Sequence, residues 1–241
     1  MNHEDKYFGI CTLSHICSCA SQSVDINNVS SNKDQYKQYR TCLSYILQDM
    51  GRDVVSRWLL LSSFFYRMKQ YGESLRLLSY ALSKCTPEKL YGYESKVSEL
   101  HDHFLDSNIF KNKIAFARYM NLCYVHFIPH SSLIPNELEI EVSDHDNLIP
   151  PVVFAHFLRF LCFYHKKDDK QCVDVAKQLS ATIEKMYFIK GRVELSASLN
   201  CAGLVFQLLG DYDRARRFFM AAVMCDSRFN RAMQRLQLLH G

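Results

Sequence analysis

The chain has 241 residues, 48% of them hydrophobic, which excludes a disordered protein and allows one large domain or an extended array. Its 29 lysines and arginines exceed its 25 acidic residues by a net charge of +4, too little to favour nucleic acid or a membrane as partner. Most of the 10 cysteines stand singly in apolar patterns, which indicates core residues in a reducing compartment rather than disulfides.

Residues 1–34 carry no evident targeting signal. Glu4 and Asp5 stand where a secretory signal needs positive charge, and the apolar run that follows is short and broken by His15. The longest apolar runs of the chain, WLLLSSFFY and VVFAHFLRFLCFY, fall short of the roughly 20 residues that span a membrane. We therefore expect a cytoplasmic protein without a membrane segment, and the order of residues 1–34 stays open.

Residues 35–241 have the pattern of an all-α domain of about ten helices. Glycine and proline are scarce, at 8 and 5 residues, and apolar residues recur at spacings of three and four. The first strong helix is expected over about 36–50, and Thr86 and Pro87 end a helical pair. Four of the five prolines fall in the stretch 128–151, which predicts the main loop there.

Two segments of the chain match each other without gaps, 55–87 and 196–227, and they define repeat-like units over 54–87 and 195–228. Each unit has an apolar stripe on its first half and another on its second, as a helix hairpin requires. The matched positions are Trp58 and Leu199, Leu61 and Ala202, Ser62 and Gly203, Phe65 and Phe206, Tyr71 and Tyr212, Ser74 and Ala215, Leu78 and Phe219, and Ala81 and Ala222.

Small residues and a turn signal support the hairpin interpretation. Two antiparallel helices approach within about 8–10 Å only where small side chains face each other, and Ser62 and Gly203 supply such faces. Gly210 is placed to end a helix in a left-handed turn, and Asp211 to cap the next helix. In the earlier unit Lys69 and Gln70 replace this pair, so its turn is expected to be less well determined.

This pattern resembles the tetratricopeptide repeat, a helix hairpin of about 34 residues. The repeat's signature is a large apolar residue, a leucine, a small residue, an aromatic, Gly-Asp-Tyr, then alanine, aromatic and alanine. Residues 196–227 keep nearly all of it. The resemblance implies an α-solenoid, with degenerate helical pairs over 91–127 and 152–187. The last helix, 228–240, would cap it, with Arg228, Arg231 and Arg235 facing solvent.

In such arrays the first helix of each unit lines a groove where peptides dock. The resemblance therefore implies a partner groove, and we expect no carboxylate clamp in it, because the positions of the family's paired lysine, asparagine and arginine are not matched. The candidate groove residues are Ser56, Leu59, Ser63, Tyr66 and Arg67 in the first unit and Asn200, Leu204 and Gln207 in the last.

A wider likeness covers about residues 35–240. The strings KQYRTCLSYILQDM, SRWLLLSSFFYRMKQY, SKCTPEKLY, SSLIPNELEIEV and IPPVVFAHFLRFLCFYH are similar to the C-terminal helical extension of male-abnormal-type proteins, relatives of cyclic GMP-AMP synthase. In that family the extension follows a nucleotidyltransferase domain, which this sequence lacks. The resemblance implies an alternative function as a regulatory or oligomerising appendage (a fragment) of such a nucleotidyltransferase, involved in nucleic-acid sensing or innate immunity.

Candidate chemistry is sparse. Glu137, Glu139 and Glu141 alternate as metal-binding carboxylates on a strand would, but no Gly-Ser turn or second strand accompanies them, and a solvated extended linker is the simpler interpretation. His15, Cys17 and Cys19 lack a second ligand pair for zinc, and His101 and His103 lie on different helix faces. His156 and His165 are interpreted as partly buried, hydrogen-bonded histidines.

The sequence thus predicts a non-catalytic scaffold that binds a protein or peptide through a helical-repeat groove. No catalytic residue, cofactor or metal is expected, nucleic acid is not favoured as a partner, and the oligomeric state stays open. A metal-dependent enzyme acting through Glu139 is the least favoured alternative.

Overall fold

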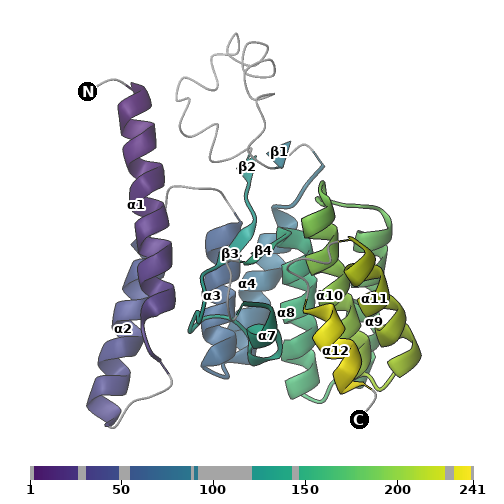
Figure 1. Ribbon diagram of the computed structural model, residues 1–241. Helices are drawn as coiled ribbons and strands as arrows, with labels where there is room; N and C mark the ends of the chain where they lie inside the picture. The colour runs from purple at the N-terminus through teal and green to yellow at the C-terminus, as the bar shows by residue number, and fades with distance from the viewer. Residues whose placement is uncertain are drawn as a thin grey trace.

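The structure is a computed structural model that describes residues 3–26, 31–48, 55–87, 90–91, 121–142, 147–225 and 231–239. These residues are mostly helical, with short strands (Figure 1). In chain order the elements are α1 (His3–Ser23), α2 (Asn32–Gln48), α3 (Ser56–Arg67), α4 (Tyr71–Ser83), β1 (Leu90–Tyr91), β2 (Asn121–Leu122), β3 (Val125–Phe127), the 3-10 helix η2 (Asn136–Leu138), α7 (Glu139–Val142), β4 (Asn147–Ile149), α8 (Pro151–His165), α9 (Asp169–Glu184), α10 (Arg192–Leu208), α11 (Tyr212–Cys225) and α12 (Ala232–Leu238).

Three helix hairpins, α3–α4, α8–α9 and α10–α11, lie side by side (Figure 1). Two of them occupy the segments whose sequences align, and the third lies within 152–187 apart from its first residue. Helix α8 packs against α3 and α4 of one neighbouring hairpin, and both α8 and α9 pack against α10 of the other. None of the described helices is both long and apolar enough to cross a membrane.

The three hairpins share one turn. Lys69, Lys167 and Gly210 follow the first helix with φ of 58°, 58° and 79°, the left-handed region that ends helices. The residue after each one donates its N–H to the carbonyl five positions earlier. Asp211 then accepts the N–H of Arg214 at 3.0 Å. Lys69 therefore adopts the conformation of Gly210 despite its Cβ. The turn of the first unit is as regular as that of the last unit, contrary to the expectation that it would be less well determined.

Small side chains form the seams between the helices of a hairpin. Ser74 donates to the carbonyl of Ser62 at 2.9 Å, between α4 and α3, and Ser196 donates to the carbonyl of Ala222 at 3.1 Å, between α10 and α11. A Cβ on Gly203 would lie 2.5 Å from Cε1 of Phe219, so this glycine sets the closeness of α10 and α11. Among the signature residues, Tyr212 is exposed and Trp58, Phe65 and Tyr71 are partly buried. The buried ones are Leu61, Ser62, Ala81, Leu199, Ala202, Phe206, Ala215, Phe219 and Ala222.

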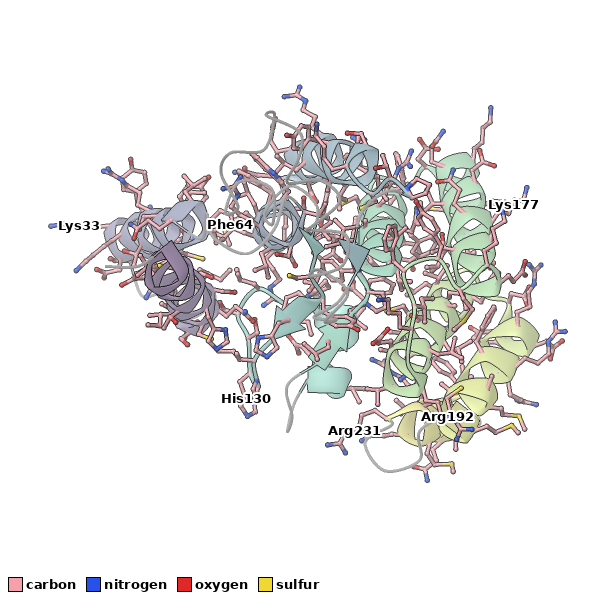
Figure 2. All side chains as sticks on the ribbon, turned by 90° about the horizontal axis from the view of Figure 1, so that it is seen from above. Lys33, Phe64, His130, Lys177, Arg192 and Arg231 are labelled. Carbon is pink, nitrogen blue, oxygen red and sulfur yellow. The ribbon has the colours of Figure 1, made fainter. Side chains whose placement is uncertain are left out.

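Helices α1 and α2 pack together and stand beside α3 (Figure 1). Helix α1 occupies most of the segment whose order the sequence left open. The fully buried ring of Phe64 on α3 lies 5.0 Å from that of Tyr39 on α2, while Lys33 and Lys177 point outward at opposite ends of the molecule (Figure 2). At the end of α1, Gln22 donates to the carbonyl of His126 and accepts the N–H of Ile128, both at 3.0 Å.

The stretch 121–151 differs from expectation. The predicted helical pair over 91–127 falls largely outside the described residues, and its described end forms strands β2 and β3, a correction to the sequence analysis. Strand β1 pairs with β2 in parallel, and β3 pairs with β4 in an antiparallel ladder that matches Val125 with Ile149. The Pro-rich stretch between β3 and β4 is more than a loop, because it contains η2 and α7. ELEIEV is therefore helical rather than an extended linker.

Helix α12 packs on α11, within the range expected for the terminal helix. Arg235 is buried on it, contrary to the prediction that it faces solvent. Its guanidinium donates to the carbonyl of Glu137 at 2.5 Å. Arg231 is half-buried, and Arg228 lies outside the described residues.

We predict that Gly203→Ala destabilises the protein by about 1–3 kcal/mol, because the added methyl group must displace the ring of Phe219. Gly72→Ala on α4 is the matched control, since a Cβ there meets no atom within 4 Å, and the gain in helix propensity should leave stability unchanged or slightly higher. Urea unfolding measures the free energy of unfolding of both variants. Equal stability for the two would contradict the close packing of α10 against α11 at Gly203.

Candidate functional site

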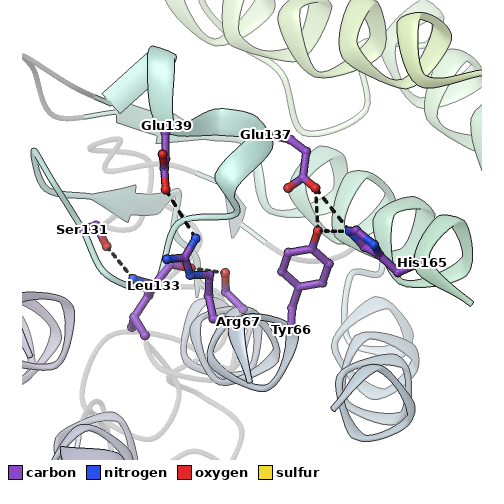
Figure 3. A network of polar contacts seen from close by, with 8 residues as sticks. Tyr66, Arg67, Ser131, Leu133, Glu137, Glu139 and His165 are labelled. Atoms are coloured by element: carbon purple, nitrogen blue, oxygen red, sulfur yellow. Dashed lines mark hydrogen bonds and ion pairs between the residues drawn. The ribbon is translucent and has the colours of Figure 1, made fainter. Parts of the chain in front are cut away.

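Residues 131–139, here called the inner segment, lie alongside the second half of α3 (Figure 3). Ser63 donates to the carbonyl of Leu133 at 2.5 Å. The side chains of Leu133, Ile134 and Leu138 are buried and belong to the same core as α3 and α8. The face of α3 is therefore covered by a peptide from the same chain, held through both its backbone and its apolar side chains.

The carboxylate of Glu137 lies between α3 and the end of α8. The hydroxyl of Tyr66 donates to its Oε1 at 2.8 Å, and Nε2 of His165 lies 2.9 Å from the Tyr66 hydroxyl and 3.3 Å from the same Oε1 (Figure 3). Because the single phenol hydrogen goes to the carboxylate, a His165 with its proton on Nε2 can donate to the phenol oxygen. Tyr66 and His165 thus both bind one carboxylate oxygen, and this pair of side chains is here called the holder.

The surroundings keep the Tyr66 phenol a hydrogen-bond donor. Burial, with the nearby negative charge of Glu137 as a second cause, raises the pKa of Tyr66 well above its usual value. The pKa of Tyr71 is also raised, first by desolvation, and its ring stacks on that of His165 with centroids 5.2 Å apart. The stacked ring fixes His165 in place beside Glu137. Since the phenol stays protonated at ordinary pH, it remains a hydrogen-bond donor to Glu137.

Two arginines contact the inner segment beyond this holder. Arg67 pairs with Glu139 across 3.4 Å, with the arginine side chain 9% exposed and the glutamate 59% exposed. Arg235 approaches from α12 and donates to the backbone carbonyl of Glu137. The polar contacts around the segment therefore come from groups that favour carboxylates and carbonyl oxygens.

The candidate groove residues of the first unit all lie on α3, and three of them contact the inner segment. Ser63, Tyr66 and Arg67 make the contacts given above, while Leu59 is fully buried and Ser56 is 6% exposed. As a groove for a partner, this face is filled by the chain itself. It becomes accessible only if residues 131–139 move away.

The candidate groove residues of the last unit lie on α10, and α8 stands between that helix and α3 (Figure 1). Asn200 and Leu204 are buried, and Gln207 is half-buried. The structure therefore does not bring the two predicted sets together into one site.

No metal centre forms among the described residues, where no group of three or more histidine, cysteine or acidic side chains gathers. Glu137 and Glu139 turn to different partners, and the side chain of Glu141 lies outside the described residues. Nε2 of His15 lies 3.8 Å from the sulfur of Cys19, while Cys17 is buried. His101 and His103 fall outside the described residues.

The two histidines of α8 have different roles. His156 is buried in the core, where desolvation and then the charge of Arg159 lower its pKa to about 4, so it is neutral at physiological pH. Its Nδ1 has no hydrogen-bond partner among the described atoms, so the expected hydrogen bonding is not seen at this nitrogen. His165 reaches the surface and binds Glu137.

Sequence reasoning missed the roles of Glu137, His165 and Arg235. Tyr66 and Glu137 are 71 residues apart, and Glu137 and Arg235 are 98 apart, so no local pattern links them. One signal was present: the apolar residues Leu133, Ile134 and Leu138 are unusual for a solvated loop between prolines. They indicated a segment that packs on the helices.

Comparison of the sequence with protein-family models, with curated proteins and with solved structures finds no match in any of the three.

We predict that Tyr66→Phe destabilises the protein by about 1–3 kcal/mol, because it removes a donor from a carboxylate that is mostly buried. A double-mutant cycle with Glu137→Gln should give a coupling energy of about 0.5–3 kcal/mol. Chemical unfolding of the four proteins measures both quantities.

The control for this cycle is the exposed pair of Arg76 and Glu73 on α4, 3.0 Å apart. Arg76→Ala should change stability by no more than about 0.5 kcal/mol. A Tyr66–Glu137 coupling near zero, with the same folded state retained, would show that the holder does not form.

Proposed function

We propose that this chain is a non-catalytic interaction scaffold, a tetratricopeptide-like α-solenoid that binds a peptide or protein through the inner faces of its hairpins. The observation that carries the proposal is the inner segment on α3. Ser63, Tyr66 and Arg67 bind a backbone carbonyl and two carboxylates of that segment. These are the kinds of contact by which a helical groove recognises a peptide.

The arrangement of the hairpins supports the solenoid part of the proposal. A single hairpin cannot bury both of its apolar stripes, so similar hairpins stack and share a core. Here the three hairpins share one turn geometry, and small residues form the α3–α4 and α10–α11 seams. Of the first helices of the three units, α3 is the one whose face meets a peptide segment, because its neighbours enclose most of α8 and because Asn200 and Leu204 on α10 are buried.

A second candidate function is the appendage of a cyclic GMP-AMP synthase-like nucleotidyltransferase. The observation that favours it is the exposed apolar surface of the α1–α2 pair, where Leu13, Ile16 and Leu47 are each more than half exposed. This candidate function requires these side chains to form one contiguous contact surface for another domain. The chain would then regulate or oligomerise the catalytic protein.

The test of the first proposal is affinity purification of the tagged chain from its native cells, followed by mass spectrometry. We predict that wild-type protein recovers specific partners and that Tyr66→Ala combined with Arg67→Ala loses them, because both side chains belong to the receptor face. Arg76→Ala, on the exposed side of α4, should keep them.

Circular dichroism and thermal melting first establish that each variant is folded. Partners that the double variant retains at wild-type level would contradict binding at the α3 face. A nucleotidyltransferase among the recovered proteins, unaffected by the double variant, would favour the second candidate.

A further inference from the structure

We propose that the inner segment is an internal ligand, which competes for the α3–α8 face with a partner peptide of the same chemistry. Such a peptide has two adjacent apolar residues, like Leu133 and Ile134, and a carboxylate side chain three positions after the second, like Glu137. The inference rests on the proposed function and names the class of partner: an acidic, apolar peptide.

The apolar part of this description comes from burial. Leu133 and Ile134 are adjacent and at most 2% exposed, and Leu138 is 1% exposed. All three belong to the core that includes α3 and α8. A competing peptide has to replace these side chains, since their removal would leave apolar surface on the helices in contact with water.

The acidic part comes from the polar groups that meet the segment. Tyr66 and His165 hold the carboxylate of Glu137, and Arg67 pairs with Glu139. A neutral side chain at the place of Glu137 would lose the charge-assisted hydrogen bond from Tyr66. Ser63, by contrast, binds the backbone carbonyl of Leu133, which any peptide can provide. The face therefore combines a contact to any backbone with selection for carboxylates.

The attachment of the segment allows it to leave without unfolding the hairpins. Its backbone hydrogen bonds are mostly local: the N–H of Ile134 reaches the carbonyl of Ser131, and that of Leu138 reaches the carbonyl of Pro135. The ladder of β3 and β4 holds the chain on both sides of it, through 125–127 and 147–149. The segment thus lies in the connection between two paired strands. Outside itself it bonds to the carbonyl of Ile128 and to α1, α3, α8 and α12.

An internal ligand weakens the binding of any competitor. The apparent affinity for an added peptide is reduced by the fraction of molecules in which the face is open. Weakening the segment therefore strengthens binding of the competitor, whereas weakening the receptor face reduces it. These opposite signs distinguish an internal ligand from a part of the fold that has no competitor.

The experiment uses a fluorescein-labelled peptide with the sequence of residues 129–140, PHSSLIPNELEI, and fluorescence polarisation with the full chain. The variant with Leu133→Ala and Glu137→Gln should bind it at least about tenfold more tightly than wild type, because its own segment competes less. Adding Tyr66→Phe to this variant should weaken binding about tenfold, which corresponds to the loss of one charge-assisted hydrogen bond.

The matched control is the same peptide with glutamine in place of glutamate at the position of Glu137. It should bind the Leu133→Ala, Glu137→Gln variant about tenfold more weakly than the glutamate peptide. If this double variant does not fold by circular dichroism, Glu137→Gln alone is measured with the same two peptides.

A folded variant that binds the glutamate peptide no more tightly than wild type would overturn the inference, as would equal binding of the two peptides. Wild-type protein that forms a dimer by exchanging this segment would also overturn it, because a second copy would then be the occupant. If the inference fails while affinity purification still recovers partners that depend on Tyr66 and Arg67, the proposed function stands. If no such partner is recovered, the proposed function fails whatever the peptide does.

Discussion

The structure depends on the burial of α8 along most of its length. All residues from Pro151 to Leu158 on this helix are buried, and so are Phe160, Leu161 and Cys162. A helix that is apolar all round is stable only when other elements enclose it. Here α3, α4, α9 and α10 do so, which places one hairpin on each side of α8–α9. The same packing brings His165, at the surface end of α8, beside Tyr66 on α3.

This arrangement also explains why the inner segment has a place to bind. The packing of α3 against α4 and α8 leaves one face of α3 to be covered, and residues 131–139 cover it with apolar side chains. The carboxylate of Glu137 enters that mostly buried environment, where charge is unfavourable unless it is hydrogen-bonded. Tyr66 and His165 provide the bonds to its Oε1, while Oε2 is buried without a hydrogen-bond partner among the described atoms. The segment is thus specified by a polar holder as well as by apolar burial, and this combination is what a peptide-binding face requires.

The parts of the fold that local sequence determines were predictable. The sequence predicted the turn at Gly210 and Asp211 and the close packing of α11 at Gly203, because both depend on residues nearby in the chain. The left-handed turns at Lys69 and Lys167 were not predictable, since lysine rarely adopts the positive φ that both residues have there. The inner segment and the burial of Arg235 depend on contacts between residues far apart in the chain, which helical periodicity does not encode. Tyr66 and Arg67 were identified as candidates for binding, but not the segment that they bind.

The central claim is that residues 131–139 are bound to α3 by the holder of Tyr66 and His165. Hydrogen exchange of this stretch, followed by mass spectrometry, tests it most directly. The N–H of Ser132 bonds to the carbonyl of Gln22 on α1, and burial protects the local bonds of Leu133, Ile134 and Leu138, only while the segment is in place. The account predicts slow exchange of residues 131–138 in wild-type protein, and faster exchange of these residues alone in Tyr66→Phe, with α8 still protected. Exchange at the rate of an unstructured peptide in wild-type protein would contradict it.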